Sequence, residues 1–189
     1  PLAAPSANPF GYISPTTAAH VDQQLGQQIP YILDGGSSTV GLESTIVGFP
    51  NGQPTVFRKG GIAVEDLEKI AGPMIIKPHS SSNPQAPGML KSHYAPRIPM
   101  VIGKPEDYLA MHSAHEIGCI RFREPVVGVP EAQQLVLSPA GDYQEAARRL
   151  FAGMRALDGQ SLSIIVAELV PEEGLGRAIN DRLRRASAR

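Results

Sequence analysis

The sequence lacks several features on which whole classes of protein depend. Among its 189 residues there is one cysteine, Cys119, which excludes an internal disulfide and a zinc site built from cysteines. No apolar run approaches the roughly 20 residues that a membrane-spanning helix needs. The start of the chain also lacks the charged and apolar segments of a secretion signal. We therefore expect a soluble protein in a reducing, cytoplasmic setting, with no membrane contact.

An excess of charge of one sign is also missing. The 17 Lys and Arg residues balance 18 Asp and Glu residues, which gives a formal net charge of −1 at pH 7. Proteins that bind nucleic acid carry a basic patch or stripe, so this balance argues against direct nucleic-acid binding. Arginines do gather at residues 177–189, but Glu172, Glu173 and Asp181 lie among them. We interpret this segment as a solvated helix face. The histidines have no ligand-like spacing to acidic residues, so no metal site on protein side chains is expected.

Glycine and proline are abundant, with 19 and 18 residues, and they break the first half of the chain into short elements. A helix is predicted to begin at Ser14, which can cap it, with Pro15 in the first helical position, and to end at Gly26. A second short helix is predicted from Val64 to Ile70. Short strands are expected at Tyr31–Leu33, Ser44–Val47, Thr55–Phe57 and Met74–Ile76.

The second half alternates strand and helix patterns. Strands are predicted at 100–102, 117–122, 135–137 and 162–167, and helices at 106–111, 142–157 and 175–186. Asp142 and Glu145 have the spacing of a capping box. Cys119 lies in an apolar run and is expected in the core. The alternation predicts a small three-layer α/β domain.

No periodicity is visible between His79 and about Pro99, and such a long loop is typical of a linker or a functional lid. We therefore divide the chain into residues 1–78, a linker at 79–98 and a domain at 99–189. The apolar side chains of Met89, Leu90 and Tyr94 indicate that the linker packs against something. A linker held against the surface of its own domain is the open alternative.

Candidate ligand-binding residues concentrate in the first half. Ser6 and Asn8 alternate in an extended stretch, so both can face one cavity. Ser14 at a helix N-terminus favours a phosphate group, and Arg58 before a glycine turn can bind phosphate oxygens through two bonds. Ser44 can bind a polar ligand at a strand edge. An ordinary helix cap, a solvated charge and a strand residue remain the respective alternatives.

Together these segments resemble one family over the whole chain. The motifs PLAAPSAN, SPT, GLESTIV, FRKGGI, GMLKSHYAP and GLGRAINDRLRRAS resemble, in order and number, the long two-domain form of the L-threonylcarbamoyladenylate synthase (YrdC-like) family. The resemblance implies an α/β fold with three parts. These are the C-terminal part of a YrdC-like twisted-sheet catalytic domain at 1–78, a linker over the active site at 79–98, and a small Rossmann-like parallel α/β domain at 99–189.

The resemblance also implies a reaction, in which L-threonine, bicarbonate and ATP with Mg²⁺ give threonylcarbamoyl-AMP and pyrophosphate. A tRNA threonylcarbamoyl-transferase complex then uses the product to modify adenosine in tRNA. The resemblance assigns catalysis to Ser6 and Asn8, ATP binding to Ser6, Ser14, Arg58 and Tyr94, and threonine binding to Ala4 and Ser44.

One part of the family pattern is absent from this sequence. The family's N-terminal half, with its KxR motif, does not occur in it, so we expect an incomplete catalytic domain that is inactive by itself. A non-catalytic module that binds a nucleotide or a partner protein for regulation is the alternative function.

Overall fold

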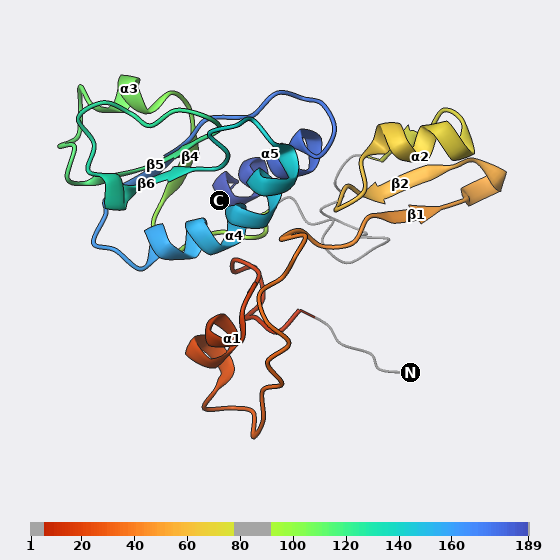
Figure 1. Ribbon diagram of the computed structural model, residues 1–189, viewed down its shortest axis with the longest axis horizontal. Coiled ribbons are helices and arrows are strands. Elements are labelled where there is room, and N and C mark those ends of the chain that lie inside the picture. The colour runs from red at the N-terminus through yellow and green to blue at the C-terminus, as the bar shows by residue number, and fades with distance from the viewer. Residues whose placement is uncertain (1–5, 78–91, 189) are drawn as a thin grey trace.

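The computed structural model describes residues 6–77 and 92–188. The strands of these residues form two separate sheets (Figure 1). One is a mixed sheet of three strands in the order β1-β2-β3, and the other is a parallel sheet of four strands in the order β4-β7-β5-β6. The predicted α/β class is therefore correct.

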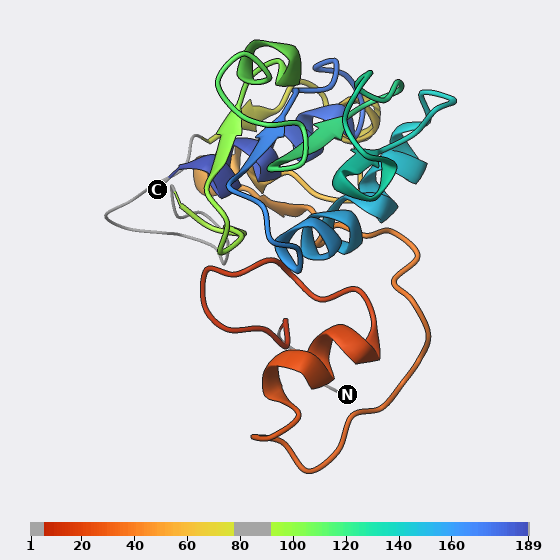
Figure 2. The ribbon, with the colours of Figure 1, turned by 90° about the vertical axis from the view of Figure 1, so that its left-hand side faces the viewer.

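The first half contains short elements separated by long irregular stretches. They are α1 (Ala18–Leu25), β1 (Ile46–Gly48), the 3-10 turn η1 (Pro50–Gly52), β2 (Thr55–Arg58), α2 (Val64–Ala71) and β3 (Ile75–Ile76). β1 runs antiparallel to β2, and β3 runs parallel to it. In Figure 2, α1 lies apart from the layers formed by the rest of the chain. The predicted strand at Tyr31–Leu33 is wrong, because this segment is irregular, and both of its end residues are exposed.

The start of α1 also differs from the prediction. Thr17 is the cap, and its side chain accepts a hydrogen bond from the backbone N–H of His20 at 3.2 Å. Ser14 lies three residues earlier, outside the helix, because its polar groups are engaged elsewhere. Its hydroxyl bonds to Glu43, and its carbonyl accepts a hydrogen bond from Arg155. Ser14 is therefore not at the N-terminus of α1, contrary to the prediction.

The second half follows the predicted alternation more closely. Its elements are β4 (Met100–Ile102), α3 (Pro105–Tyr108), β5 (Ile117–Arg121), the 3-10 turn η2 (Glu131–Gln133), β6 (Gln134–Val136), α4 (Tyr143–Asp158), β7 (Ile164–Ala167) and α5 (Gly176–Ser187). α4 and α5 pack on one face of the parallel sheet, and α3 and its flanking loops pack on the other. Cys119 is buried under the α3 face, as predicted.

The cap of α4 uses one residue more than a capping box. The Asp142 side chain accepts hydrogen bonds from the backbone N–H groups of Gln144 and Glu145, as predicted. The return bond of a capping box, from the Asp142 N–H to the Glu145 carboxylate, does not form directly. Ser138 stands between them, because its hydroxyl accepts from the Asp142 N–H and donates to Glu145.

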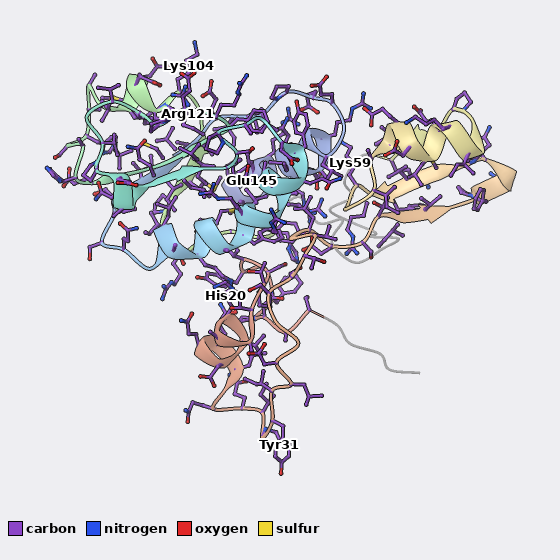
Figure 3. The ribbon with its side chains drawn as sticks, viewed as in Figure 1. His20, Tyr31, Lys59, Lys104, Arg121 and Glu145 are labelled. Carbon is purple, nitrogen blue, oxygen red and sulfur yellow. The ribbon has the colours of Figure 1, made fainter. Side chains whose placement is uncertain are left out.

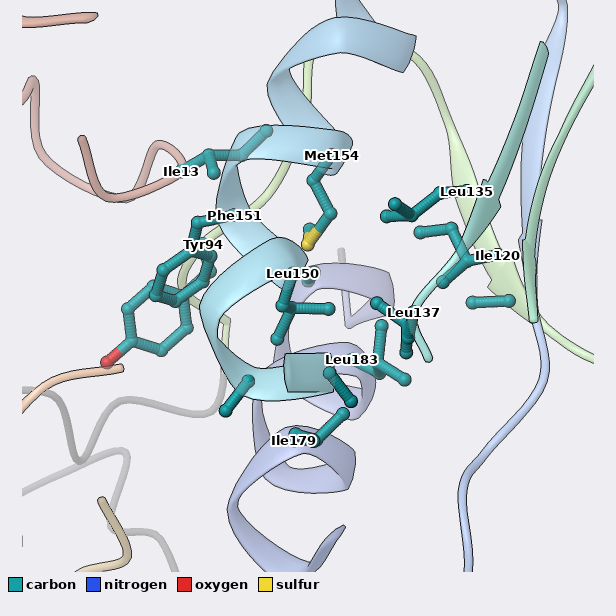
Figure 4. Packing of buried hydrophobic residues seen from close by; sticks show 14 of the residues in the cluster. Ile13, Tyr94, Ile120, Leu135, Leu137, Leu150, Phe151, Met154, Ile179 and Leu183 are labelled. Atoms are coloured by element: carbon teal, nitrogen blue, oxygen red, sulfur yellow. The ribbon is translucent and has the colours of Figure 1, made fainter. Parts of the chain in front are cut away.

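One buried cluster joins the two halves of the chain. Ile13 and Leu42 come from the first half and pack with residues of α4, which include Leu150, Phe151 and Met154 (Figure 4). The core of the parallel-sheet layer therefore extends to the segments that precede β1. Within the described part of the chain, no helix has the length and apolarity required to cross a bilayer.

Candidate functional site

A cavity of about 270 Å³ lies where the segments before β1 meet α4. Its lining is more apolar than polar, and Phe151 of α4 forms one wall. The lining residues are Ser6, Ala7, Ser14, Pro15, Thr16, Ser38, Gly41, Leu42, Glu43 and Phe151. Two of the predicted ligand-binding residues, Ser6 and Ser14, thus border one cavity.

Glu43 organises the polar side of this cavity. Its Oε1 accepts a hydrogen bond from the Ser14 hydroxyl at 2.8 Å, and its Oε2 accepts two from Arg182 at 2.8 and 3.0 Å. Burial raises the pKa of the Glu43 carboxyl, but the Arg182 charge and these hydrogen bonds outweigh burial. The net effect lowers the pKa below its ordinary value, so Glu43 is ionised.

Arg182, on α5, has a side chain that is 0% exposed. Its guanidinium also donates to the carbonyl of Lys59 at 2.8 Å and to Asp181 at 2.9 Å. A buried arginine is tolerated only when its charge is paired and its donors are satisfied, and both conditions are met here. Burial lowers the pKa of Arg182, but the neighbouring negative charges more than compensate and raise it, so the side chain stays cationic.

A second arginine, Arg155 of α4, holds the backbone beside the cavity. Its guanidinium donates to the carbonyls of Ile13 and Ser14, and to the side chain of Gln24 at 2.9 Å. It also lies 5.1 Å from the centre of the Tyr12 ring. The segment that carries Ser14 is therefore bound to α4 through its main chain and to α5 through Glu43.

Arg58 and Ser44 contact each other beside this network. Arg58 donates through Nε to the Ser44 carbonyl and through a second nitrogen to the Ser44 hydroxyl, both at 3.0 Å. Burial is the main cause that lowers the pKa of Arg58, whereas the charge of Glu43 acts in the opposite direction. The structure thus brings the predicted ATP-binding arginine and the predicted threonine-binding serine together, at the end of β2 and just before β1.

Asn8 is turned away from the cavity lining. Its side-chain amide donates to the carbonyls of Pro9 and Tyr12, both at 3.0 Å, and so holds a local turn. Ser6 lines the cavity, but Asn8 does not, so the expected shared orientation of the two side chains is not seen in this structure. Ala4, the other predicted threonine-pocket residue, lies outside the described residues.

Tyr94 lies in the core, next to the cavity wall. It is 1% exposed, and its ring centre is 5.3 Å from that of Phe151. The guanidinium carbons of Arg182 and Arg185 lie 5.3 and 4.9 Å from the ring centre, at cation–π distances. Its φ of 63° is in the left-handed region, which bulky residues rarely adopt. Of the predicted linker at 79–98, residues 79–91 lie outside the described residues.

Two arginines of α5 near the site differ from the prediction. Residues 177–189 were expected to form a solvated helix face, but Arg182 and Arg185 are buried. A signal was present, because Arg182 lies three residues after Ile179 on the apolar stripe of the predicted helix. A charged residue on such a stripe indicates a buried ion pair. Figure 3 shows the many side chains that meet where the first half approaches α4 and α5.

Comparisons with known proteins give one consistent match. The model for the C-terminal domain of threonylcarbamoyl-AMP synthase matches residues 62–188, and a model described as telomere recombination matches residues 1–60. The threonylcarbamoyl-AMP synthase of Pyrococcus abyssi is 36% identical over 198 residues, and that of Bacillus subtilis is 35% identical over 202 residues. Each alignment covers 99% of this chain, and 58% and 57% of the respective relative.

Solved structures of one of these relatives have a fold similar to that of this chain. The crystal structure of P. abyssi Sua5 complexed with L-threonine superposes with a TM-score of 0.81 at 32% identity, over 97% of this chain and 57% of that one. A variant of that protein with alanine in place of an adjacent histidine and tyrosine gives the same TM-score at 31% identity, over 97% and 56% of the two chains. The chain therefore spans a little over half the length of the relatives and structures it matches.

Proposed function

The chain belongs to the threonylcarbamoyl-AMP synthase family, and on that premise we propose that it takes part in making threonylcarbamoyl-AMP and pyrophosphate from L-threonine, bicarbonate and ATP. The observation that carries this proposal is the likeness, over 97% of the chain, to a structure in complex with L-threonine. The product would serve a tRNA threonylcarbamoyl-transferase complex in the cytoplasm. The balanced charge of the chain argues against direct tRNA binding.

The proposed assignment of residues follows the family resemblance. Ser6 and Asn8 act in catalysis, ATP is bound by Ser6, Ser14, Arg58 and Tyr94, and threonine is bound by Ala4 and Ser44. The shared cavity of Ser6 and Ser14 supports this assignment, as does the contact of Arg58 with Ser44. That contact would place the phosphate groups of ATP close to threonine, as a condensation of the two substrates requires.

The chemistry fits these residue types. Forming an adenylate from anionic reactants needs cations and hydrogen-bond donors around the phosphate and carbamate groups, and it needs no protein nucleophile. Arg58 supplies a planar cation that can hold two phosphate oxygens at once. Mg²⁺ enters as part of the ATP substrate. In the described part of the chain, no three His, Cys, Asp or Glu side chains are grouped to hold a metal ion.

We also propose the domain division derived from the sequence, with catalytic residues at 1–78, a linker over the active site at 79–98 and a Rossmann-like domain at 99–189. The separate sheets on either side of the linker support this division, since β3 ends the mixed sheet and β4 begins the parallel one. The family model for the C-terminal domain begins earlier, at residue 62.

The test uses the complete protein encoded by the gene that contains this sequence. Release of pyrophosphate from ATP is measured with and without L-threonine and bicarbonate, and threonylcarbamoyl-AMP is detected by mass spectrometry. We expect release to require both compounds, and Arg58→Ala to weaken ATP binding and product formation by about tenfold or more. Arg184→Ala, which changes an arginine in an exposed ion pair with Glu172, is the matched control.

Two outcomes would count against the proposal. Release of pyrophosphate that is independent of threonine would show a different reaction. ATP binding without any product would favour the alternative function, a regulatory module that binds a nucleotide. Ser44→Ala tests which substrate Ser44 contacts. Loss of a hydrogen bond to threonine should raise the KM for threonine more than the KM for ATP.

A further inference from the structure

Three side chains from distant parts of the sequence form a continuous chain of hydrogen bonds that ends in the cavity. Arg182 of α5 donates twice to Glu43, and Ser14 donates to the other oxygen of the same carboxylate. Of these three residues, Ser14 and Glu43 line the cavity, whereas Arg182 lies behind them and is fully buried. An arginine from the last helix thus determines how a carboxylate is held in the first half.

The guanidinium of Arg182 cannot easily adopt another orientation. Its hydrogen bonds reach Glu43, the Lys59 carbonyl and Asp181, and the ring centre of Tyr94 lies 5.3 Å from its central carbon. Because the group is planar and its partners lie in different directions, only one orientation satisfies all of them. The charge is out of contact with water, so added salt screens it weakly.

This arrangement fixes the hydrogen-bonding polarity of Ser14. Arginine has donors only, and an ionised carboxylate has acceptors only. Glu43 therefore accepts from Arg182 on one oxygen and from the Ser14 hydroxyl on the other. The single proton of the Ser14 hydroxyl is then committed to Glu43, and the lone pairs of Ser14 Oγ remain for a group in the cavity.

We propose that Arg182 is a positioning residue for the substrate site, which orients Glu43 so that Ser14 faces the cavity as a hydrogen-bond acceptor. The ligand group that contacts Ser14 is then a hydrogen-bond donor. This proposal rests on the proposed function, under which threonine offers a hydroxyl and an ammonium group, and ATP offers ribose hydroxyls and the adenine amino group. It assigns to α5, at the far end of the sequence, a direct part in forming the site.

Glu43→Gln tests the polarity with little change in side-chain size. In this variant the amide oxygen at position 43 must face Arg182, so the amide NH₂ group faces Ser14 and donates to it. The Ser14 proton then points toward the cavity. Two donors now face each other, so the hydrogen bond between Ser14 and the ligand is lost. We expect affinity for the substrate in contact with Ser14 to fall about tenfold, the size of one hydrogen bond lost from such a site.

A double-mutant cycle distinguishes this effect from general damage. ATP and L-threonine are titrated separately by calorimetry into the complete protein and into its Ser14→Ala, Glu43→Gln and doubly substituted variants. If Glu43 acts through Ser14, Glu43→Gln has no further effect once Ser14 is alanine. Weaker binding of threonine alone assigns the donor to threonine, and weaker binding of ATP alone assigns it to the ribose or adenine of ATP.

Arg182→Lys tests the first step of the chain of bonds. A lysine keeps the charge but cannot hold Glu43 with two nitrogens while it also reaches Asp181 and the Lys59 carbonyl. We expect the same substrate to bind more weakly, in the same direction as with Glu43→Gln. Arg184→Lys, on the same helix but exposed and paired with Glu172, should leave both affinities unchanged. Near-ultraviolet circular dichroism verifies that each variant is folded.

Three results would overturn the inference. Additive effects of Glu43→Gln and Ser14→Ala would show that Glu43 does not act through Ser14. Unchanged affinities in Arg182→Lys, or binding of neither compound to the wild-type protein, would also exclude the positioning role. None of these titrations requires turnover. A protein that binds both compounds but makes no product would therefore contradict the proposed function without contradicting this inference.

Discussion

The two halves of the described chain are stabilised in different ways. In residues 92–188, α4 and α5 contain eight and nine buried residues, whereas α1 in residues 6–77 contains none. Of the eleven large apolar side chains that are exposed, nine lie in residues 6–77 and two in residues 92–188. The second half thus has its own core, whereas the first half leaves apolar surface open.

The first half is instead held by polar anchors that the second half supplies. Arg155 and Arg182 bind Ser14 and Glu43, and only a few apolar residues, such as Ile13 and Leu42, join the shared core. Buried ion pairs fix geometry well but add little net stability, since the loss of hydration offsets much of the attraction. These anchors therefore fix the position of residues 6–77, which carry most of the cavity lining. They add little net stability to that half.

The largest expected effect comes from removing the ionic anchor. Arg182→Ala leaves the largely buried Glu43 without its cation and removes one of the two arginines that pair with Asp181, which should cost about 3–5 kcal/mol of unfolding free energy in urea. Arg184→Ala, in an exposed ion pair, should cost less than about 1 kcal/mol. Equal costs for the two variants would mean that Arg182 does not anchor the first half.

The next largest effect on unfolding free energy is expected at a buried leucine, and an exposed leucine is its control. Leu150 of α4 is 0% exposed, and Leu33 is 95% exposed. Leu150→Ala should lower the unfolding free energy by about 3 kcal/mol through lost burial and the cavity left behind, and Leu33→Ala should change it by less than about 0.5 kcal/mol. A large cost for Leu33→Ala would show that the apolar surface of the first half is covered in solution.

A smaller effect on stability is expected from the helix caps, because α4 is packed in the core and α1 is not. Asp142→Ala removes the cap of α4 and should cost about 1 kcal/mol of global stability, because α4 unfolds only with the core. Thr17→Ala removes the cap of α1, which buries no residue, so we expect local fraying with little global change. Hydrogen exchange of residues 18–25, measured beside urea unfolding, distinguishes the two results.

The smallest effect is the pH dependence carried by Glu43. Its folded-state pKa lies below the ordinary value, so its contribution to stability is complete above the unfolded pKa of about 4.3 and is lost as pH falls through the folded pKa. The stability of the wild-type protein should therefore decline more steeply below about pH 4 than that of Glu43→Gln. Parallel pH profiles of the urea midpoint for the two proteins would contradict the ionised Glu43–Arg182 pair.

Sequence patterns predicted the second half better than the first for a physical reason. The predicted ranges for α4, α5, β4 and β7 overlap the observed ones, since these elements bury a regular stripe or run of apolar residues. Tyr31–Leu33 has the composition of a strand but is exposed and irregular, because among the described residues no strand lies beside it to pair with. Local composition cannot supply a partner strand.

The sequence by itself determined the α/β class and the family, because motifs and apolar periodicity are local properties. It also predicted Ser6 and Ser14, two of the ten residues that line the cavity. The tertiary structure alone decided that Ser14 bonds to Glu43 and does not cap α1, and that Arg182 is buried and not solvated. These results depend on contacts between residues 29 and 139 positions apart in the sequence. A local pattern contains no information about which distant charge will neutralise a given side chain, and only folding brings Arg182 to Glu43.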